Sequence, residues 1–261
     1  MNNSCVSCNT PLKGKFCYSC GEKVVENNDF SIQNLLHQFI NGITNFDSKF
    51  LKSFYYLLFK PGQLTLNYVN GRRVSFMKPF QVFIVVNILF FFFLADADVF
   101  RIPAKWYFNN EINIEKKITD SKNVELIKQQ YDNESLTNSK LFIFILIPFF
   151  GIIFWMANLK KKLYFGKHII FAIHYLSFFM LFSVCLVITP KEIWTPRAIQ
   201  AVLLISNFIY LFFAIRKFYN NTNKVAFIKA LLCVFICFTL IFFYRDLISY
   251  YTYKMVIKEY I

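Results

Sequence analysis

The apolar segments of this chain contain no Asp or Glu before Asp246. Carboxylates inside the membrane are the groups on which acid-based proton pumps are built, so their absence argues against such a pump. The chain also has no Gly-rich phosphate loop, no HExxH zinc motif, no nucleophile elbow and no pair of intramembrane carboxylates. Because no catalytic constellation is present, the sequence favours a role other than that of an enzyme.

The sequence is not expected to begin with a secretory leader. Residues 1–10 are polar, and the first apolar run begins at Phe80, which is too far along the chain for a cleaved signal peptide. Acidic residues are scarce, with 15 Asp and Glu against 29 Lys and Arg, and the net charge is +14. Such a charge suggests nucleic-acid binding in a soluble protein, so its distribution along the chain decides what it means here.

Long apolar runs are abundant in this chain. Hydrophobic residues make up 56% of it, and 35 of the 261 residues are Phe. Five runs are near or within the roughly 17–25 residues that cross a bilayer as a helix. They cover residues 80–94, 141–158, 168–189, 198–215 and 225–244. We therefore predict an all-α polytopic membrane protein with five transmembrane helices, the second of them kinked at Pro148 and Gly151.

Basic residues concentrate on one side of these runs. If the N-terminus is inside, residues 1–79 carry nine Lys and Arg against four acids, and the loops 159–167 and 216–224 carry net charges of +4 and +3. The loop 95–140 would then be outside, and it has seven basic and eight acidic residues. The totals are +12 inside and +1 outside, which is the positive-inside pattern. This pattern predicts a cytoplasmic N-terminus and an outside C-terminus, and it explains the basic charge without nucleic acid as a partner.

Residues 1–25 carry the pattern of a zinc ribbon, in which two C-x2-C pairs are separated by eight residues. Each pair can form a knuckle whose thiolates face one tetrahedral ion, and a hairpin around Gly14 would bring the knuckles together. Disulfides are the alternative, but the predicted cytoplasmic location is reducing. We predict a structural Zn²⁺ ion, which would also supply the folding energy of so small a module. The predicted ligands are Cys5, Cys8, Cys17 and Cys20.

Residues 30–79 are predicted to form amphipathic helices and a junction to the first span. Apolar residues at a helical period predict helices over residues 31–43 and 48–59. Both are too short and too polar to cross a bilayer, so they either lie in the membrane interface or pack against each other as a hairpin. Residues 63–69 predict a further helical turn ending at Gly71 in the left-handed conformation, with a β-hairpin at Asn70-Gly71 as the alternative.

The junction before the first span contains Arg72, Arg73 and Lys78. These cations would lie among lipid headgroups and hold the helix end on the cytoplasmic side. The two arginines also offer forked donors to phosphate, so the junction is either a site for anionic lipid or a topological anchor alone. Pro79 suits the first position of the helix that follows, where a missing N–H costs nothing.

The predicted membrane domain covers residues 80–261. Its outer loop, residues 95–140, is either a small lid or a solvated connection, and it contains a helical pattern near Ile127 and Tyr131. The tail that begins at Arg245 also has a helix-compatible pattern. It would either extend the fifth helix beyond the bilayer or lie along the outer surface.

Three polar residues within the spans are candidates for an intramembrane site. Asn87, His174 and Asn207 are costly in lipid unless they meet partners or line a water-filled cavity. The alternative is an interhelical hydrogen bond between His174 and one of the asparagines. His168 and His174 are six residues apart, about 120° around a helix, which does not suit two ligands of one metal ion. Lys229 is interpreted as a snorkelling anchor.

The order of the motifs resembles a known family. After the FCxxCG ribbon and the amphipathic helices come P-G, then Y-x2-G-[KR]-R-x2-[FY]-x2-P, a Phe-rich span and HxxFAxHxxSF. This looks like the bacterial membrane protein family catalogued as domain-of-unknown-function family 3667. The resemblance implies a multi-pass protein of the bacterial inner membrane with no assigned activity. The matching residues are Pro61, Gly62, Tyr68, Gly71, Arg72, Arg73, Phe76, Pro79, His168, Phe171, Ala172, His174, Ser177 and Phe178.

Two functional hypotheses follow from these patterns, ahead of a third, a membrane enzyme, for which no catalytic constellation is present. The first is a non-enzymatic membrane scaffold or regulator whose ribbon recruits a cytosolic protein. The second is a small-solute transporter or channel with a polar path near His174, although five spans without a visible repeat fit the repeat-built transporters poorly. The arrangement of the three intramembrane polar residues discriminates between them. Convergence on a cavity favours transport, whereas dispersal to separate interfaces favours the scaffold.

Overall fold

The computed structural model describes residues 4–5, 8, 10–20, 49–72, 75–93, 99–108, 121–187 and 196–258. The chain divides into two compact units, Met1–Lys49 and Phe50–Ile261. The helix predicted over residues 31–43 and the junction residue Arg73 lie outside the described residues. The first unit contains the four clustered cysteines, and the second contains all the candidate spans.

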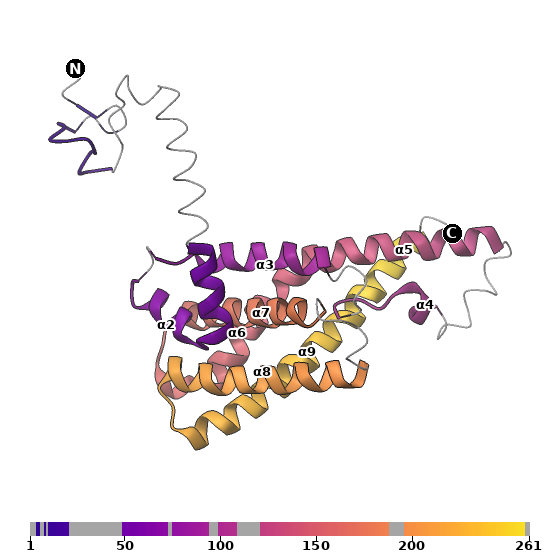
Figure 1. Ribbon diagram of the computed structural model, residues 1–261. Helices are drawn as coiled ribbons and strands as arrows, with labels where there is room; N and C mark the ends of the chain where they lie inside the picture. Colours follow the sequence, from indigo (N-terminus) through magenta and orange to yellow (C-terminus); the bar gives the residue numbers. More distant parts are fainter. Residues whose placement is uncertain are drawn as a thin grey trace. The chain divides into compact units, whose positions relative to one another are not determined.

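The second unit is built from helices. Its first helix covers residues 50–59 and is drawn in dark purple in Figure 1. The α-helices that follow are α2 (Gln63–Val69), α3 (Pro79–Phe93), α4 (Ala104–Tyr107), α5 (Ser121–Phe142), α6 (Leu146–Ala157), α7 (Phe165–Val187), α8 (Pro196–Tyr219) and α9 (Asn223–Lys258). Two 3₁₀ turns adjoin α6, namely η2 (Ile143–Ile145) and η3 (Leu159–Lys161). The described residues of this unit contain no strand, in agreement with the predicted all-α class.

Four helical stretches of the described chain are long and apolar enough to cross a membrane, namely Val124–Ala157, Phe165–Leu186, Ala198–Tyr219 and Asn223–Lys258. They correspond to the second to fifth predicted runs, so the prediction of an α-helical polytopic membrane protein is confirmed. The first run corresponds to α3, whose 15 residues reach only about 22 Å, less than the roughly 30 Å of a bilayer core. The residues directly after α3 are not described, so a span over the first run, and with it the count of five spans, stays a prediction.

Helix α7 lies in the middle of the bundle. Figure 1 shows it between α3 and α8, and it makes extensive contacts with α3 and α6. Its most apolar stretch is 72% buried, whereas the corresponding stretches of the other three candidate spans are 28% to 33% buried. Because neighbouring helices cover most of the surface of α7, little of that surface is left for lipid. The core is therefore built around α7, and the other spans leave much of their apolar surface for lipid.

The predicted irregularity in the second apolar run lies one turn before Pro148, at the 3₁₀ turn η2 between α5 and α6. Proline has no N–H to donate to the carbonyl four residues earlier, and its ring crowds that carbonyl. Here that carbonyl belongs to Phe144, which is the middle residue of η2. Gly151 has a different role, because a Cβ at this position would collide with the Ile169 side chain of α7. It allows α6 and α7 to approach closely.

Helices α5 and α9 continue beyond their apolar stretches and pack against each other. The segment predicted as an outer loop, residues 95–140, is therefore helical over its last part, as the pattern near Ile127 and Tyr131 indicated. α9 runs unbroken for 36 residues, so the tail extends the last helix. Ile127 and Tyr131 are buried together with Val256 of α9 and Ala104 of α4. These contacts form a small second core apart from the main one.

The helix over residues 50–59, called the cross helix below, runs across the bundle axes. In Figure 1 it is nearly perpendicular to α3 and α8, at the end of the bundle where α3 begins and α8 finishes. Its Leu57 side chain is fully buried, as is Leu64 of α2 at 3% exposure. At four-residue steps along its other face, Leu51, Tyr55 and Phe59 are half or more exposed. The cross helix is therefore amphipathic, with one face packed on the bundle and the other exposed.

Candidate functional site

The sulfur atoms of the four N-terminal cysteines converge. All four Sγ atoms lie within 4.8 Å of one another, and separations of 3.5 Å join Cys5 to Cys20 and Cys8 to Cys17. A disulfide needs an S–S distance of about 2.05 Å, and all four thiols are free. Four thiolates at about 2.3 Å from one tetrahedral ion would be about 3.8 Å apart. The donor set therefore fits a Zn²⁺ ion held by all four side chains.

The loop around the first CxxC pair holds its cysteines in place and lowers the pKa of one of them. The Cys5 N–H donates to the Thr10 carbonyl at 2.8 Å, and Ser4 and Pro11 form an antiparallel bridge, so the pair lies on a closed loop. Hydrogen bonds with the side chain and the backbone of Thr10 lower the pKa of the Cys8 thiol to about 6. Thiolate is the metal-binding form of cysteine, so a thiol that loses its proton near neutral pH is a ready ligand.

The buried histidine of α7 contacts a residue that the sequence did not single out. Nδ1 of His174 lies 2.9 Å from the hydroxyl oxygen of Thr65 on α2, and both side chains are buried. The other ring nitrogen, Nε2, has no hydrogen-bond partner among the described residues. Thr65 is a hydroxyl residue between Leu64 and Leu66, and this break in an apolar stretch is the signal that could have pointed to it. The contact ties α2 to the middle of α7.

Asn87 and Asn207 make no hydrogen bond to His174 within the described chain. The Nδ2 atom of Asn207 donates to the Leu203 carbonyl of its own helix at 2.8 Å, and its Oδ1 atom has no partner there. The Nδ2 atom of Asn87 on α3 is also buried without a described partner. The structure thus brings His174 together with Thr65, and it leaves the two asparagines outside that contact.

A set of polar contacts joins the turn after α6 to the turn after α8. Asn158 ends α6, and its Oδ1 atom accepts hydrogen bonds from Lys229 Nζ at 2.8 Å and from Asn221 Nδ2 at 3.2 Å. Nδ1 of His168 lies 2.8 Å from the Tyr219 hydroxyl, and the two rings stack. The two turns must therefore lie on the same side of the bundle. Lys229, expected as a simple anchor, has a specific partner.

The junction before α3 leaves its described cations exposed. Arg72 and Lys78 are exposed, and neither forms an ion pair with a described residue. Pro79 is the first residue of α3, as predicted, and the Lys78 N–H donates to Oε1 of Gln81 at 3.1 Å. Exposed cations at the start of an apolar helix suit an anchor and an anionic headgroup site equally well.

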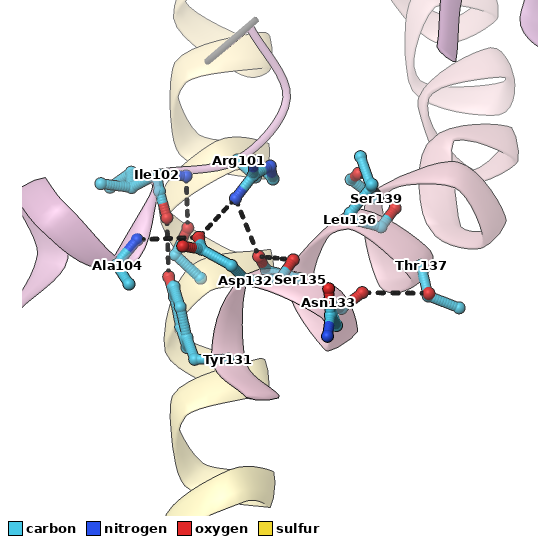
Figure 2. Close-up of polar contacts among 11 residues, drawn as sticks. Arg101, Ile102, Ala104, Tyr131, Asp132, Asn133, Ser135, Leu136, Thr137 and Ser139 are labelled. Atoms are coloured by element: carbon cyan, nitrogen blue, oxygen red, sulfur yellow. Dashed lines mark hydrogen bonds and ion pairs between the residues drawn. The ribbon is translucent and has the colours of Figure 1, made fainter. Parts of the chain in front are cut away.

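An ion pair that the sequence did not predict lies beyond the end of α3. NH1 of Arg101 is 2.7 Å from Oδ1 of Asp132 on α5, and the Arg101 side chain is only 9% exposed. The same Oδ1 atom accepts a hydrogen bond from the Ala104 N–H at 2.9 Å. Figure 2 shows Arg101 and Ala104 approaching this carboxylate from the segment that precedes α4 and from its first residue. The Asp132 carboxylate thus binds both the Arg101 side chain and the Ala104 backbone.

The same segment is also bonded to α9. The Ile102 N–H donates to Ser249 Oγ of α9 at 2.9 Å, and the Ile102 carbonyl accepts a hydrogen bond from the Tyr131 hydroxyl of α5 at 2.9 Å. The side chains of Arg101, Tyr131, Asp132 and Ser249 are called the α5–α9 latch below. They fasten residues 99–108 to both long helices.

Comparison with known proteins yields one match. A family model described as "Protein of unknown function (DUF3667)" matches residues 47–91. The match covers the cross helix, α2, the junction and most of α3, and it supports the resemblance drawn from the P-G and Y-x2-G motifs. The HxxFAxHxxSF motif of α7 lies outside the matched residues. No curated protein and no solved structure matches the chain.

Proposed function

We propose that the protein is a non-enzymatic membrane scaffold or regulator of the bacterial inner membrane, whose N-terminal zinc site recruits a cytosolic protein. The observation that carries this proposal is the dispersal of the polar residues of the spans. His174 pairs with Thr65, and Asn207 bonds its own helix. Polar side chains that bond one neighbouring helix or their own backbone are usual in a static bundle.

The convergence of four thiols supports the recruiting role. A module with so little apolar core gains its shape from the metal, so its exposed surface exists only when the ion is bound. A protein partner is preferred over nucleic acid, because the positive-inside distribution already accounts for the basic charge. The scaffold role therefore predicts recruitment that depends on zinc.

The test is affinity capture with the solubilised full-length protein. Wild type is compared with Cys17→Ser/Cys20→Ser, which removes two ligands, and with Cys185→Ser, which removes an exposed cysteine of α7 outside the cluster. We expect a cytosolic protein that copurifies with wild type and Cys185→Ser and is lost with the double variant. The same set of proteins in all three captures would contradict the proposal.

Transport of a small solute is the second candidate, and one observation favours it. His174 Nε2, Asn87 Nδ2 and Asn207 Oδ1 are all buried without a partner in the described chain. Buried polar atoms of this kind commonly bond a water molecule or a ligand. Solute flux into liposomes that wild type supports and His174→Phe abolishes would establish transport and set the scaffold aside.

We also propose that the junction binds an anionic lipid headgroup through Arg72, Arg73 and Lys78. The exposure of the two described cations supports this. Native mass spectrometry of Arg72→Ala/Arg73→Ala tests it, and we expect less bound anionic lipid than for wild type. Unchanged lipid binding would leave these residues as topological anchors alone.

A further inference from the structure

An apolar groove of about 320 Å³ lies between the cross helix, α7 and α8. Its lining includes Phe59 of the cross helix, Pro61 of the turn that follows, Phe178 and Phe182 of α7, and Ser206 and Tyr210 of α8. The rings of Phe178 and Tyr210 stack with their centroids 3.7 Å apart, so α7 and α8 are in direct contact there. The small side chains of Ser206 and Cys185 leave the space that large residues would fill.

The lining indicates a hydrocarbon occupant. Apart from the Tyr210 hydroxyl, the hydroxyl of Ser206 is the one polar side-chain group among the lining residues, and it donates to the Leu203 carbonyl of its own helix at 3.0 Å. The Ser206 hydroxyl hydrogen is therefore already used in this bond and is not available to water or to a polar solute. A surface with so few polar groups binds water poorly, so an apolar group is the occupant that it accepts.

The groove belongs to the lipid-facing surface of the bundle. Its walls α7 and α8 are both candidate membrane spans. Two of its lining residues, Phe59 and Ile209, are 69% and 47% exposed, so the groove is open at its side. In a bilayer the neighbouring medium is acyl chain. A chain that lies in the groove gains close packing contacts along its length.

The segment that lines the groove with Phe59 and Pro61 carries a cation between these two residues. Lys60 stands between the lining residues Phe59 and Pro61, and its side chain is exposed. Its Nζ atom lies 4.8 Å and 5.6 Å from the ring centroids of Tyr56 and Tyr55, and it forms no ion pair with a carboxylate of the described chain. An apolar groove beside a cation without a counter-ion is complementary to an amphiphile with a negative head.

We propose that this groove holds one acyl chain of an anionic phospholipid, with the lipid phosphate at Lys60. The site differs from the junction, because neither Arg72 nor Lys78, the described cations of the junction, lines the groove. It does not depend on the scaffold role. The matched residues 47–91 include the side of the groove that the cross helix supplies.

The first test fills the groove. Native mass spectrometry measures how much added phosphatidylglycerol the full-length protein retains. Ser206→Phe places a ring in the groove, and we expect retention to fall by about tenfold or more, a change of at least about 1.4 kcal/mol. The matched control is Ala201→Phe, which adds the same ring at an exposed position of α8 outside the lining, and which is expected to behave as wild type. Ser206→Leu adds a smaller group and gives the same comparison if the Phe variant does not fold.

The second test removes the cation. Lys60→Gln is expected to reduce the preference for phosphatidylglycerol over phosphatidylcholine by about fivefold, the effect of one cation near a lipid surface. Lys52→Gln is the matched control, because Lys52 is on the cross helix and lies over the Phe76 ring, and neither of its chain neighbours lines the groove. It should leave the preference unchanged.

Several outcomes would overturn the proposal. Equal lipid retention by the Ser206→Phe and Ala201→Phe variants would exclude an acyl chain from the groove. An unchanged headgroup preference in Lys60→Gln would exclude the assigned phosphate contact. A dimer that wild type forms and Ser206→Phe abolishes would show that a second copy of the chain occupies the groove instead of lipid.

Discussion

Gly62 lies where the turn after the cross helix touches α8. Its φ is +74°, and a Cβ atom there would lie 2.7 Å from the carbonyl oxygen of Ala214. We expect Gly62→Ala to lower the free energy of unfolding in detergent by about 3 kcal/mol. Left-handed backbone strain contributes about 1–2 kcal/mol, and the collision with a backbone atom adds to it. Thermal unfolding of the purified protein measures the loss.

Gly71 provides the matched control for this prediction. Its φ is +87°, but a Cβ atom there has nothing within 4 Å. Gly71→Ala should therefore cost only the backbone strain of about 1–2 kcal/mol. Equal losses for Gly62→Ala and Gly71→Ala would mean that the close approach to Ala214 does not matter for stability.

The contact between Thr65 and His174 is expected to stabilise the bundle by a measurable amount. A double-mutant cycle of Thr65→Val and His174→Leu should give a coupling energy of about 1 kcal/mol, in the range of hydrogen bonds between membrane helices. The control cycle pairs Thr65→Val with Tyr219→Phe, which removes the hydroxyl bonded to His168. Because Thr65 and Tyr219 share no hydrogen bond, a coupling as large as in the first cycle would contradict the assignment.

The α5–α9 latch should hold residues 99–108 on the two long helices. Asp132→Ala leaves the nearly buried Arg101 without its counter-ion, and we expect a loss of about 1–3 kcal/mol. The lower part of this range is favoured, because Asp132 is 40% exposed and solvent screens the pair. Hydrogen exchange of residues 99–108 should become faster than in wild type.

The pair of Arg245 and Asp246 is the control for the latch. These residues are neighbours in the sequence, their charged atoms are 3.9 Å apart, and both are partly exposed. Asp246→Ala should change stability by less than about 0.5 kcal/mol. If the two aspartate variants lose equal stability, or if exchange in residues 99–108 does not change, the latch is not the fastening described here.

The cysteine module is expected to bind one metal ion. Purified wild-type protein should contain about one zinc per chain, and Cys17→Ser/Cys20→Ser should contain none. Elemental analysis measures this. The helical content of the double variant should stay close to that of wild type, because the cysteines lie in a different unit from the spans. An unchanged zinc content in the double variant would refute the site.

The positive-inside pattern predicts how the whole chain lies in the membrane. Reporter fusions after Lys162 and after Asn220 should both indicate the cytoplasm, and fusions near Asn123 and Ile261 should indicate the outside. The structure adds one constraint. A hydrogen bond between Asn158 and Asn221 joins the turns that contain Lys162 and Asn220, so these two reporters must agree. An external signal at Lys162 would overturn the predicted topology.

Several parts of this protein follow from local sequence. The apolar runs from residue 141 onward correspond to candidate spans because the length of such a run decides whether a helix can cross a bilayer. Pro79 begins α3 and Gly71 is left-handed because proline and glycine restrict or free their own backbone. The four cysteines lie close together because only eight residues separate the two CxxC pairs. Each of these features depends on residues that are close to one another in the sequence.

Only the tertiary structure decided which polar side chains meet. Thr65 and His174 are 109 residues apart, and Arg101 and Asp132 are 31 residues apart. The sequence suggested asparagine partners for His174, because polarity alone does not say which faces of the helices meet. The order, tilt and rotation of the packed helices set those partners. The same packing formed the groove, since its walls come from three helices that no local pattern places side by side.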